Sequence, residues 1–90
     1  MTRWRVADGI AWVAAEPERV ALIDTRDPLA QPMLVPSPFA DLWQALADGP
    51  RSETDLLALA SDLVGGDEGE SLRDEFVRSI GGAGLIEVAA

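Results

Sequence analysis

The side chains in this sequence that could do chemistry are carboxylates. Histidine, cysteine, lysine and tyrosine are all absent from the 90 residues. These four types supply most catalytic nucleophiles, most general bases near neutral pH and most transition-metal ligands. Carboxylates alone could bind a hard cation, and those that lie close together in sequence are Asp24, Asp27, Asp67, Glu68 and Glu70.

The spacing of these carboxylates, and of the glycine pairs, favours a structural role. The acidic run 67–70 does not have the spacing of an EF-hand loop, and it suits the N-terminus of a helix, where the macrodipole favours negative charge. Gly65-Gly66 and Gly81-Gly82 lack the strand, glycine-rich turn and lysine of a phosphate-binding loop, and we interpret them as helix ends. We therefore expect no enzymatic activity, no metal and no cofactor.

The charge balance argues against nucleic acid as a partner. The chain has 7 basic and 16 acidic residues, a formal net charge of −9, and its arginines are scattered along the sequence. Proteins that bind duplex DNA usually carry a basic face that displaces counterions from phosphates. Neither an apolar run of roughly 20 residues nor an apolar signal core near the N-terminus is present. We expect a cytoplasmic protein with no membrane partner.

The first third of the chain predicts short strands. Residues 10–14 carry β-formers at alternating positions, 16–18 are typical of a turn, and 20–23 form a second apolar run, which together suit a hairpin. Pro28 then interrupts the chain. A third extended run covers 31–35, and a weaker strand is predicted at 4–6.

The hydrophobic period changes after Pro36 and predicts three helices. Ser37 is the expected N-cap of the first helix, with Pro38 at its first position. Ser52 and Asp55 predict a capping box for the second helix, and the acidic run predicts that the third begins near Glu70. The expected buried faces are Phe39, Leu42, Trp43 and Leu46 in the first helix, Leu56, Leu59, Ala60 and Leu63 in the second, and Leu72, Phe76 and Ile80 in the third.

Together these elements predict an α+β, winged-helix-like fold: a three-stranded antiparallel sheet followed by three helices. We expect one domain over residues 1–90, with the strands in 1–36 and the helices and a short extended tail in 37–90. Trp43 and Trp12 are expected in the core. Trp4 is either a core residue or a partly exposed anchor.

The order and spacing of these segments resemble the PqqD-like proteins. A strand ending in Asp24, a helix ending in Asp48-Gly49, a Ser52-led helix and a last helix followed by Gly-Leu-Ile occur in the order found in that family. The matching segments are 20–24, 42–43, 46–49, 52–56, 76–77, 80 and 84–86, within a resemblance that covers roughly residues 10–88.

The resemblance implies a recognition element for ribosomally made, post-translationally modified peptides. In such domains the leader segment of the precursor joins the sheet beside the third strand, and its side chains enter a groove between that strand and the third helix. The domain then presents the precursor to a modifying enzyme. A stand-alone chain of this length is most similar to the leader-binding partner of lasso-peptide pathways, which implies a leader peptidase as partner and a cyclase downstream.

The third strand departs from the family pattern. Many relatives have aromatic residues there, whereas this chain has Gln31, Pro32, Met33, Leu34 and Val35. The run carries no charge, and edge strands that must stay unpaired are usually protected by charge or proline. If the prolines at 32 and 36 face the open side, Leu34 alone donates to a guest strand; if they face inward, Gln31, Met33 and Val35 donate. We favour the first arrangement, because proline in edge strands usually faces the open side.

The predicted peptide site combines this strand with one flank of the third helix. Val77 is the expected apolar floor of the groove, and Arg73 the expected donor to a leader carboxylate or carbonyl, with Asp74 and Arg78 beside them. Met33 would adapt to a guest side chain. The peptide-binding residues are therefore predicted to be Gln31, Met33, Leu34, Val35, Arg73, Asp74, Val77 and Arg78. Two alternatives remain open: nucleic-acid binding by a winged helix, and a structural domain that self-associates through the same strand edge.

Overall fold

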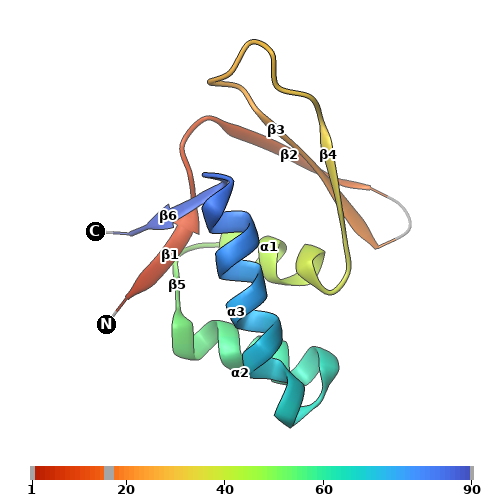
Figure 1. Ribbon diagram of the computed structural model, residues 1–90, viewed down its shortest axis with the longest axis vertical. Coiled ribbons are helices and arrows are strands. Elements are labelled where there is room, and N and C mark those ends of the chain that lie inside the picture. Colours follow the sequence, from red (N-terminus) through yellow and green to blue (C-terminus); the bar gives the residue numbers. More distant parts are fainter. Residues whose placement is uncertain (1, 16–17, 90) are drawn as a thin grey trace.

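Two three-stranded antiparallel sheets and three helices make up residues 2–15 and 18–89, the part of the chain that the computed structural model describes. The upper sheet has the strand order β2-β3-β4, and the terminal sheet has the order β5-β1-β6. Figure 1 shows the upper sheet above the helices and the terminal sheet beside both ends of the chain. In chain order the elements are β1 Arg3–Val6, β2 Ile10–Ala15, β3 Arg19–Asp24, β4 Met33–Pro36, α1 Phe39–Ala47, β5 Arg51–Ser52, α2 Glu53–Val64, α3 Gly66–Gly82 and β6 Ile86–Val88.

The upper sheet confirms the predicted hairpin and third strand. Along β3 the side chains alternate, so that Val20 and Leu22 are buried on the face toward the helices. The predicted bounds of the third strand are wrong, because β4 begins at Met33 and Gln31 lies in the loop before it. The register would place Gln31 opposite Asp24, where β3 already ends in a turn held by the Arg26 N–H on Asp24 Oδ1 at 2.9 Å. The predicted turn at 16–18 lies largely outside the described residues.

The terminal sheet uses the segments predicted as a weak strand and an extended tail. β1 pairs antiparallel with β6 on one side, with Trp4 opposite Val88, and with the two-residue β5 on the other. The sequence did not predict this second sheet, because pairing between residues so far apart leaves no local signal. The α+β class is confirmed.

Helix α1 has the predicted buried face but a different start. Leu42, Trp43 and Leu46 are buried against the upper sheet and the other helices. Ser37 is not the N-cap, which is Pro38 without a side-chain hydrogen bond. The Ser37 N–H instead donates to the carbonyl of Glu18 at 3.0 Å, and its hydroxyl pairs with the carboxylate of Asp41. The Ser37 N–H therefore adds one hydrogen bond just beyond the paired ends of β3 and β4.

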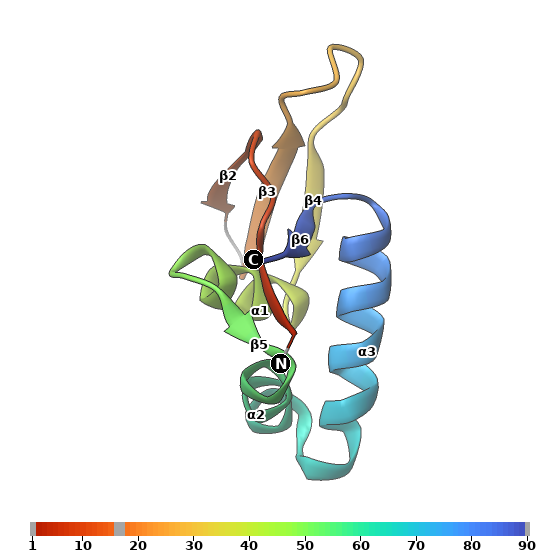
Figure 2. The same ribbon diagram turned by 90° about the vertical axis from the view of Figure 1, so that its left-hand side faces the viewer.

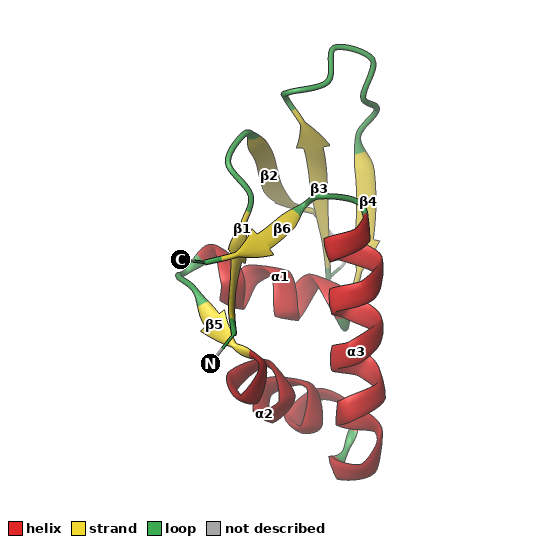
Figure 3. Cartoon of the chain, turned by 60° about the vertical axis from the view of Figure 1, so that its left-hand side comes forward, coloured by secondary structure: helices red, strands yellow, loops and turns green. Residues whose placement is uncertain are grey.

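Helices α2 and α3 pack together at the bottom of the molecule, where α2 lies across the lower part of α3 (Figures 2 and 3). The predicted capping box is present: Ser52 Oγ accepts from the Asp55 N–H at 3.0 Å, and Asp55 Oδ2 accepts from the Ser52 N–H at 3.2 Å. The predicted start of α3 near Glu70 is about one turn late, because the helix begins at Gly66 directly after the cap residue Gly65. The acidic residues Asp67 and Glu68 occupy its first turn, as the macrodipole argument requires.

Two predictions about buried residues are wrong. Trp12 is 39% exposed, because it lies on the edge strand β2 beyond the helices that cover the sheet. Leu63 is 41% exposed in the last turn of α2. Trp43 is fully buried as predicted, and Trp4 is half-buried against the core. Among the described residues no helix is both long and apolar enough to cross a membrane.

Candidate peptide-binding site

The candidate site begins at β4, which is an edge of the upper sheet. β4 pairs with β3 and has no second partner strand among the described residues. Figures 2 and 3 both place α3 next to the open side of β4. The two elements also share the hydrophobic core, since Val35 from β4 packs in the same group of buried residues as Phe76 and Ile80 from α3. The predicted neighbours, the third strand and the third helix, therefore lie together.

The direction of the backbone groups along β4 follows from the register. In an antiparallel ladder the directly opposed pairs alternate between those that exchange hydrogen bonds and those that do not. The bond from Ser37 N–H to Glu18 fixes this alternation, so that Val35 and Met33 exchange hydrogen bonds with Val20 and Leu22. The N–H and C=O of Leu34 consequently point to the open side.

Prolines lie on either side of the Leu34 N–H. They face the open side of β4, which is the arrangement that we favour from the sequence. Pro36 is two residues from Leu34, so its backbone also points to the open side, and Pro32 directly precedes the strand. A proline has no N–H to give. Leu34 is therefore the one donor that β4 offers to a guest strand.

The side chains of β4 divide between the two faces of the upper sheet. Val35 is only 4% exposed and belongs to the core, and its N–H and C=O point to β3, so neither its side chain nor its backbone groups are available to a guest. Met33 shares that face but is 43% exposed at the end of the strand. Leu34 is 57% exposed and shares the opposite, outer face with Ala21, its partner on β3.

On α3 the four predicted residues form two rows. Arg73 and Val77 are both half-buried and lie four residues apart on one flank, and Val77 packs against the core. Asp74 and Arg78 are exposed and lie four apart on the next row outward. The structure thus places the strand that carries Met33 and Leu34 beside the helix that carries Arg73 and Val77, whereas Gln31 lies outside the strand.

The charge of Arg73 is already partly satisfied. Its Nε and Nη2 donate to Asp74 Oδ1 at 3.0 Å and 2.8 Å. The guanidinium carries five N–H donors in a fixed fork, so other donors remain for a guest carbonyl or carboxylate. Any such contact is made by an arginine that Asp74 orients.

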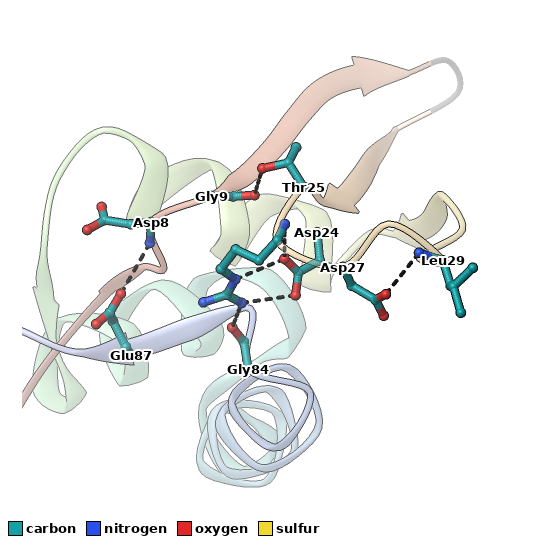
Figure 4. Close-up of polar contacts among 9 residues, drawn as sticks. Asp8, Gly9, Asp24, Thr25, Asp27, Leu29, Gly84 and Glu87 are labelled. Carbon is teal, nitrogen blue, oxygen red and sulfur yellow. Dashed lines mark hydrogen bonds and ion pairs between the residues drawn. The ribbon is translucent and has the colours of Figure 1, made fainter.

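The carboxylates examined in the sequence are not gathered into a cation site. No group of three or more histidine, cysteine, aspartate or glutamate side chains in the described parts of the chain could hold a metal ion. Asp24 instead accepts from Arg26, and these hydrogen bonds hold the pKa of the Asp24 carboxyl below its ordinary value. Figure 4 shows Asp24 at the meeting point of the β3 end and Gly84, with Asp8, Asp27 and Glu87 around it.

The sequence reasoning missed an apolar hollow on the outer face of the upper sheet. This cavity has a volume of about 280 Å³. It is lined by residues of β2 and β3 and by the proline just before β4, namely Ala11, Trp12, Val13, Ala21, Leu22, Ile23 and Pro32. A signal was available: β2 reads Ile-Ala-Trp-Val-Ala-Ala, which is apolar at both alternating sets of positions and so predicts an apolar residue on each face.

Comparison of the chain with family models, with curated proteins and with solved structures finds no match in any of the three.

Proposed function

We propose that this chain binds the leader segment of a ribosomally made precursor peptide by strand addition to β4, and that it presents the precursor to a modifying enzyme. The observation that carries the proposal is the open side of β4, where Leu34 offers an N–H and a C=O next to α3. An extended peptide that joins a sheet edge gains main-chain hydrogen bonds, and neighbouring pockets select its side chains.

The short backbone contact implies that side chains supply much of the affinity. With Pro36 and Pro32 on either side of Leu34, only two or three hydrogen bonds can form along the strand, each contributing on the order of 1 kcal/mol. A leader therefore needs an apolar side chain against Met33 and Val77, both of which keep apolar surface accessible. The polar rim is the Arg73–Asp74 pair.

The arginines favour a peptide over a nucleic acid. Three of the seven already face carboxylates: Arg5 lies near Asp8 and Glu87, while Arg26 and Arg73 pair with Asp24 and Asp74. The net charge is −9. A steep salt dependence of binding to duplex DNA, the mark of phosphate neutralisation, is expected to be absent.

Under this proposal the domain has no catalytic role, acts in the cytoplasm and works beside the enzymes of a lasso-peptide pathway. The partner that receives the bound precursor is a leader peptidase, with a cyclase acting next. The similarity to winged helices and to the PqqD-like proteins belongs to the same proposal. Copurification of this chain with a protease-like protein encoded beside a short precursor gene would support these partners.

The decisive experiment compares two substitutions at one position. Binding of a fluorescein-labelled synthetic leader, taken from the precursor encoded beside this chain, is measured by anisotropy. Leu34→Ala removes the side chain but keeps the N–H, whereas Leu34→Pro removes the donor without costing a hydrogen bond to β3. We expect saturable binding at tens of micromolar or tighter, a small change for Leu34→Ala and loss of binding for Leu34→Pro.

Circular dichroism on both variants confirms that each remains folded. Absence of saturable binding by the unmodified chain would overturn the proposed function. Equal binding by Leu34→Ala and Leu34→Pro would exclude strand addition at β4.

A further inference from the structure

The second edge of the upper sheet, β2, offers more backbone groups than β4. The Thr25 N–H donates to the carbonyl of Gly9 at 2.8 Å, which fixes the alternation of the β2–β3 ladder. Ala11, Val13 and Ala15 therefore exchange hydrogen bonds with β3. The N–H and C=O groups of the intervening residues point away from the sheet, and these residues are Ile10, Trp12 and Ala14.

Nothing in the described residues protects this edge. β2 contains neither proline nor a charged residue, and no other strand pairs on its outer side. In Figure 2, β2 is the outermost strand of the upper sheet, on the side away from α3. Trp12 is 39% exposed and Val13 is 61% exposed. Edge strands of this kind pair with other chains unless they are blocked.

We propose that two copies of this chain associate through β2, in an antiparallel pair related by a two-fold axis at Trp12. Trp12 then lies opposite its own copy, Ile10 lies opposite Ala14, and Ala11 lies opposite Val13. Every opposed pair is apolar, and an interface of this symmetry must be complementary to itself. The two upper sheets become one sheet of six strands joined by roughly six new backbone hydrogen bonds.

One pair of opposite charges, Arg19 and Asp8, fits this antiparallel arrangement, while the exposed Glu18 lies beside Arg19 and Asp8 also lies near Arg5. Arg19 lies beside the Ala15 end of β2, and Asp8, whose side chain is 90% exposed, lies just before the Ile10 end. A two-fold axis at Trp12 places Arg19 of each copy about 10 Å from Asp8 of the other, measured between Cα atoms with a strand spacing of about 4.8 Å. That separation is within reach of an arginine side chain. A parallel pairing would bring like ends together.

This association is independent of what β4 binds. The two edges lie on opposite sides of the upper sheet, separated by β3, so a dimer formed through β2 leaves Leu34 free. The apolar outer face continues across the new pairing, because Ala11 and Val13 of both copies lie side by side on it. One dimer would therefore present two β4 edges at once.

Sedimentation velocity over a range of chain concentrations tests the proposal. Ala14→Pro places a proline ring on the open side of β2 and costs no hydrogen bond to β3, and Ala14→Ser is its matched control. We expect the unmodified chain and Ala14→Ser to sediment as a monomer–dimer equilibrium. The dissociation constant of Ala14→Pro should be at least about tenfold weaker.

Val13→Lys is the second variant, used if Ala14→Pro does not fold. It places a lysine on a solvent-exposed position of the edge and lowers the net negative charge, so its loss of association cannot be attributed to greater repulsion between copies. The unmodified chain remaining monomeric at about 1 mM would overturn the proposal. Association that survives Ala14→Pro but is lost in Leu34→Pro would also overturn it, since the pairing would then use β4.

The two proposals fail separately. Ala14→Pro is expected to bind the labelled leader peptide as the unmodified chain does, and Leu34→Pro is expected to dimerise as the unmodified chain does.

Discussion

Arg26 donates to both carboxylate oxygens of Asp24, from Nε to Oδ1 at 2.9 Å and from Nη2 to Oδ2 at 3.0 Å. The same Nη2 donates to the carbonyl of Gly84 at 3.0 Å. Gly84 follows α3, so this arginine joins the end of β3 to the end of the helix that borders β4. It also lies over Gly9, where a Cβ would be 2.7 Å from Arg26 Cγ. The relative position of strand edge and helix depends in part on this link.

Arg26→Met is expected to lower the melting temperature by a small amount, because an exposed ion pair contributes little but the bond to Gly84 crosses between two elements. The measurement is thermal unfolding followed by circular dichroism at pH 7. Arg78→Met, which removes an exposed arginine from α3, is the control and should leave the melting temperature unchanged. Identical melting of both variants would contradict a structural role for the link.

The same pair gives a pH dependence in the acid range. The side-chain hydrogen bonds from Arg26, followed by its backbone N–H, hold the pKa of Asp24 below its ordinary value. A lowered folded-state pKa means that the stabilisation is fully present above the unfolded-state pKa of about 4 and is lost as the pH falls through the folded-state value. The difference in melting temperature between the unmodified chain and Arg26→Met should be constant from about pH 5 to 7 and should shrink below about pH 4. A difference that grows on acidification would contradict this assignment.

Gly69 is required by the close approach of α2 and α3. A Cβ at this position would lie 2.3 Å from Ser61 Oγ and 2.8 Å from both the Cα and N of Ser61. Because backbone atoms cannot move aside as a side chain does, Gly69→Ala should destabilise the chain by about 1–3 kcal/mol. Urea denaturation measures the change.

Gly66→Ala is the matched control for this prediction. Gly66 also lies in α3, and a Cβ there would meet nothing within 4 Å. Alanine is the better helix former, so this variant should keep or raise stability by up to about 1 kcal/mol. Equal effects at both positions would show that helix propensity, and not the contact with Ser61, determines the result.

The capping box at the start of α2 gives a fourth prediction. Ser52 is 5% exposed, and both of its hydrogen bonds with Asp55 are present. Ser52→Ala should cost about 1 kcal/mol, as the loss of an N-cap does in other proteins. Ser71→Ala, at an exposed position of α3, should change the unfolding midpoint in urea little. A similar loss for the two serines would argue against the cap.

Local signals predicted much of the fold. The alternating β-formers in 10–14 and the apolar run 20–23 predicted β2 and β3, and the Ser52–Asp55 spacing predicted the start of α2, because these features depend on residues close in sequence. Ser37 misled the prediction, since its N–H donates to the carbonyl of Glu18, a residue 19 positions away in the turn before β3. The pairing of β1 with β6 likewise depends on the whole chain.

The candidate site was predicted in outline but not in detail. The resemblance to the PqqD-like proteins implied that the third strand and the third helix meet, and the uncharged run around Leu34 and the apolar spacing of α3 located these two elements in the sequence. The direction of the Leu34 N–H required the β3–β4 register, which no local pattern supplies. Val35 was predicted as a contact, but it is a core residue because β4 alternates. The unprotected β2 edge was not predicted, because the sequence of a strand does not indicate whether it lies at the edge of its sheet.

Val77 and Gln31 provide the most direct comparison among the predicted peptide-binding residues. Val77 is half-buried against the core on α3, the helix beside β4, whereas Gln31 is exposed in the loop before the strand. Val77→Asp should weaken leader binding about tenfold or more, equal to at least about 1.4 kcal/mol, since it puts a charge where an apolar guest side chain must be buried. Gln31→Asp, with the same new charge, should change the affinity less than about threefold.

Fluorescence anisotropy with the labelled leader peptide measures both, and circular dichroism establishes that each variant is folded. If Val77→Asp unfolds, Val77→Thr keeps the shape of the side chain and replaces a methyl group by a hydroxyl, and it should still weaken binding more than Gln31→Asp. Equal losses at the two positions would mean that the guest does not lie between β4 and α3. Strand addition at Leu34 would then require the guest to place its side chains on the outer face of the upper sheet, beside Ala21.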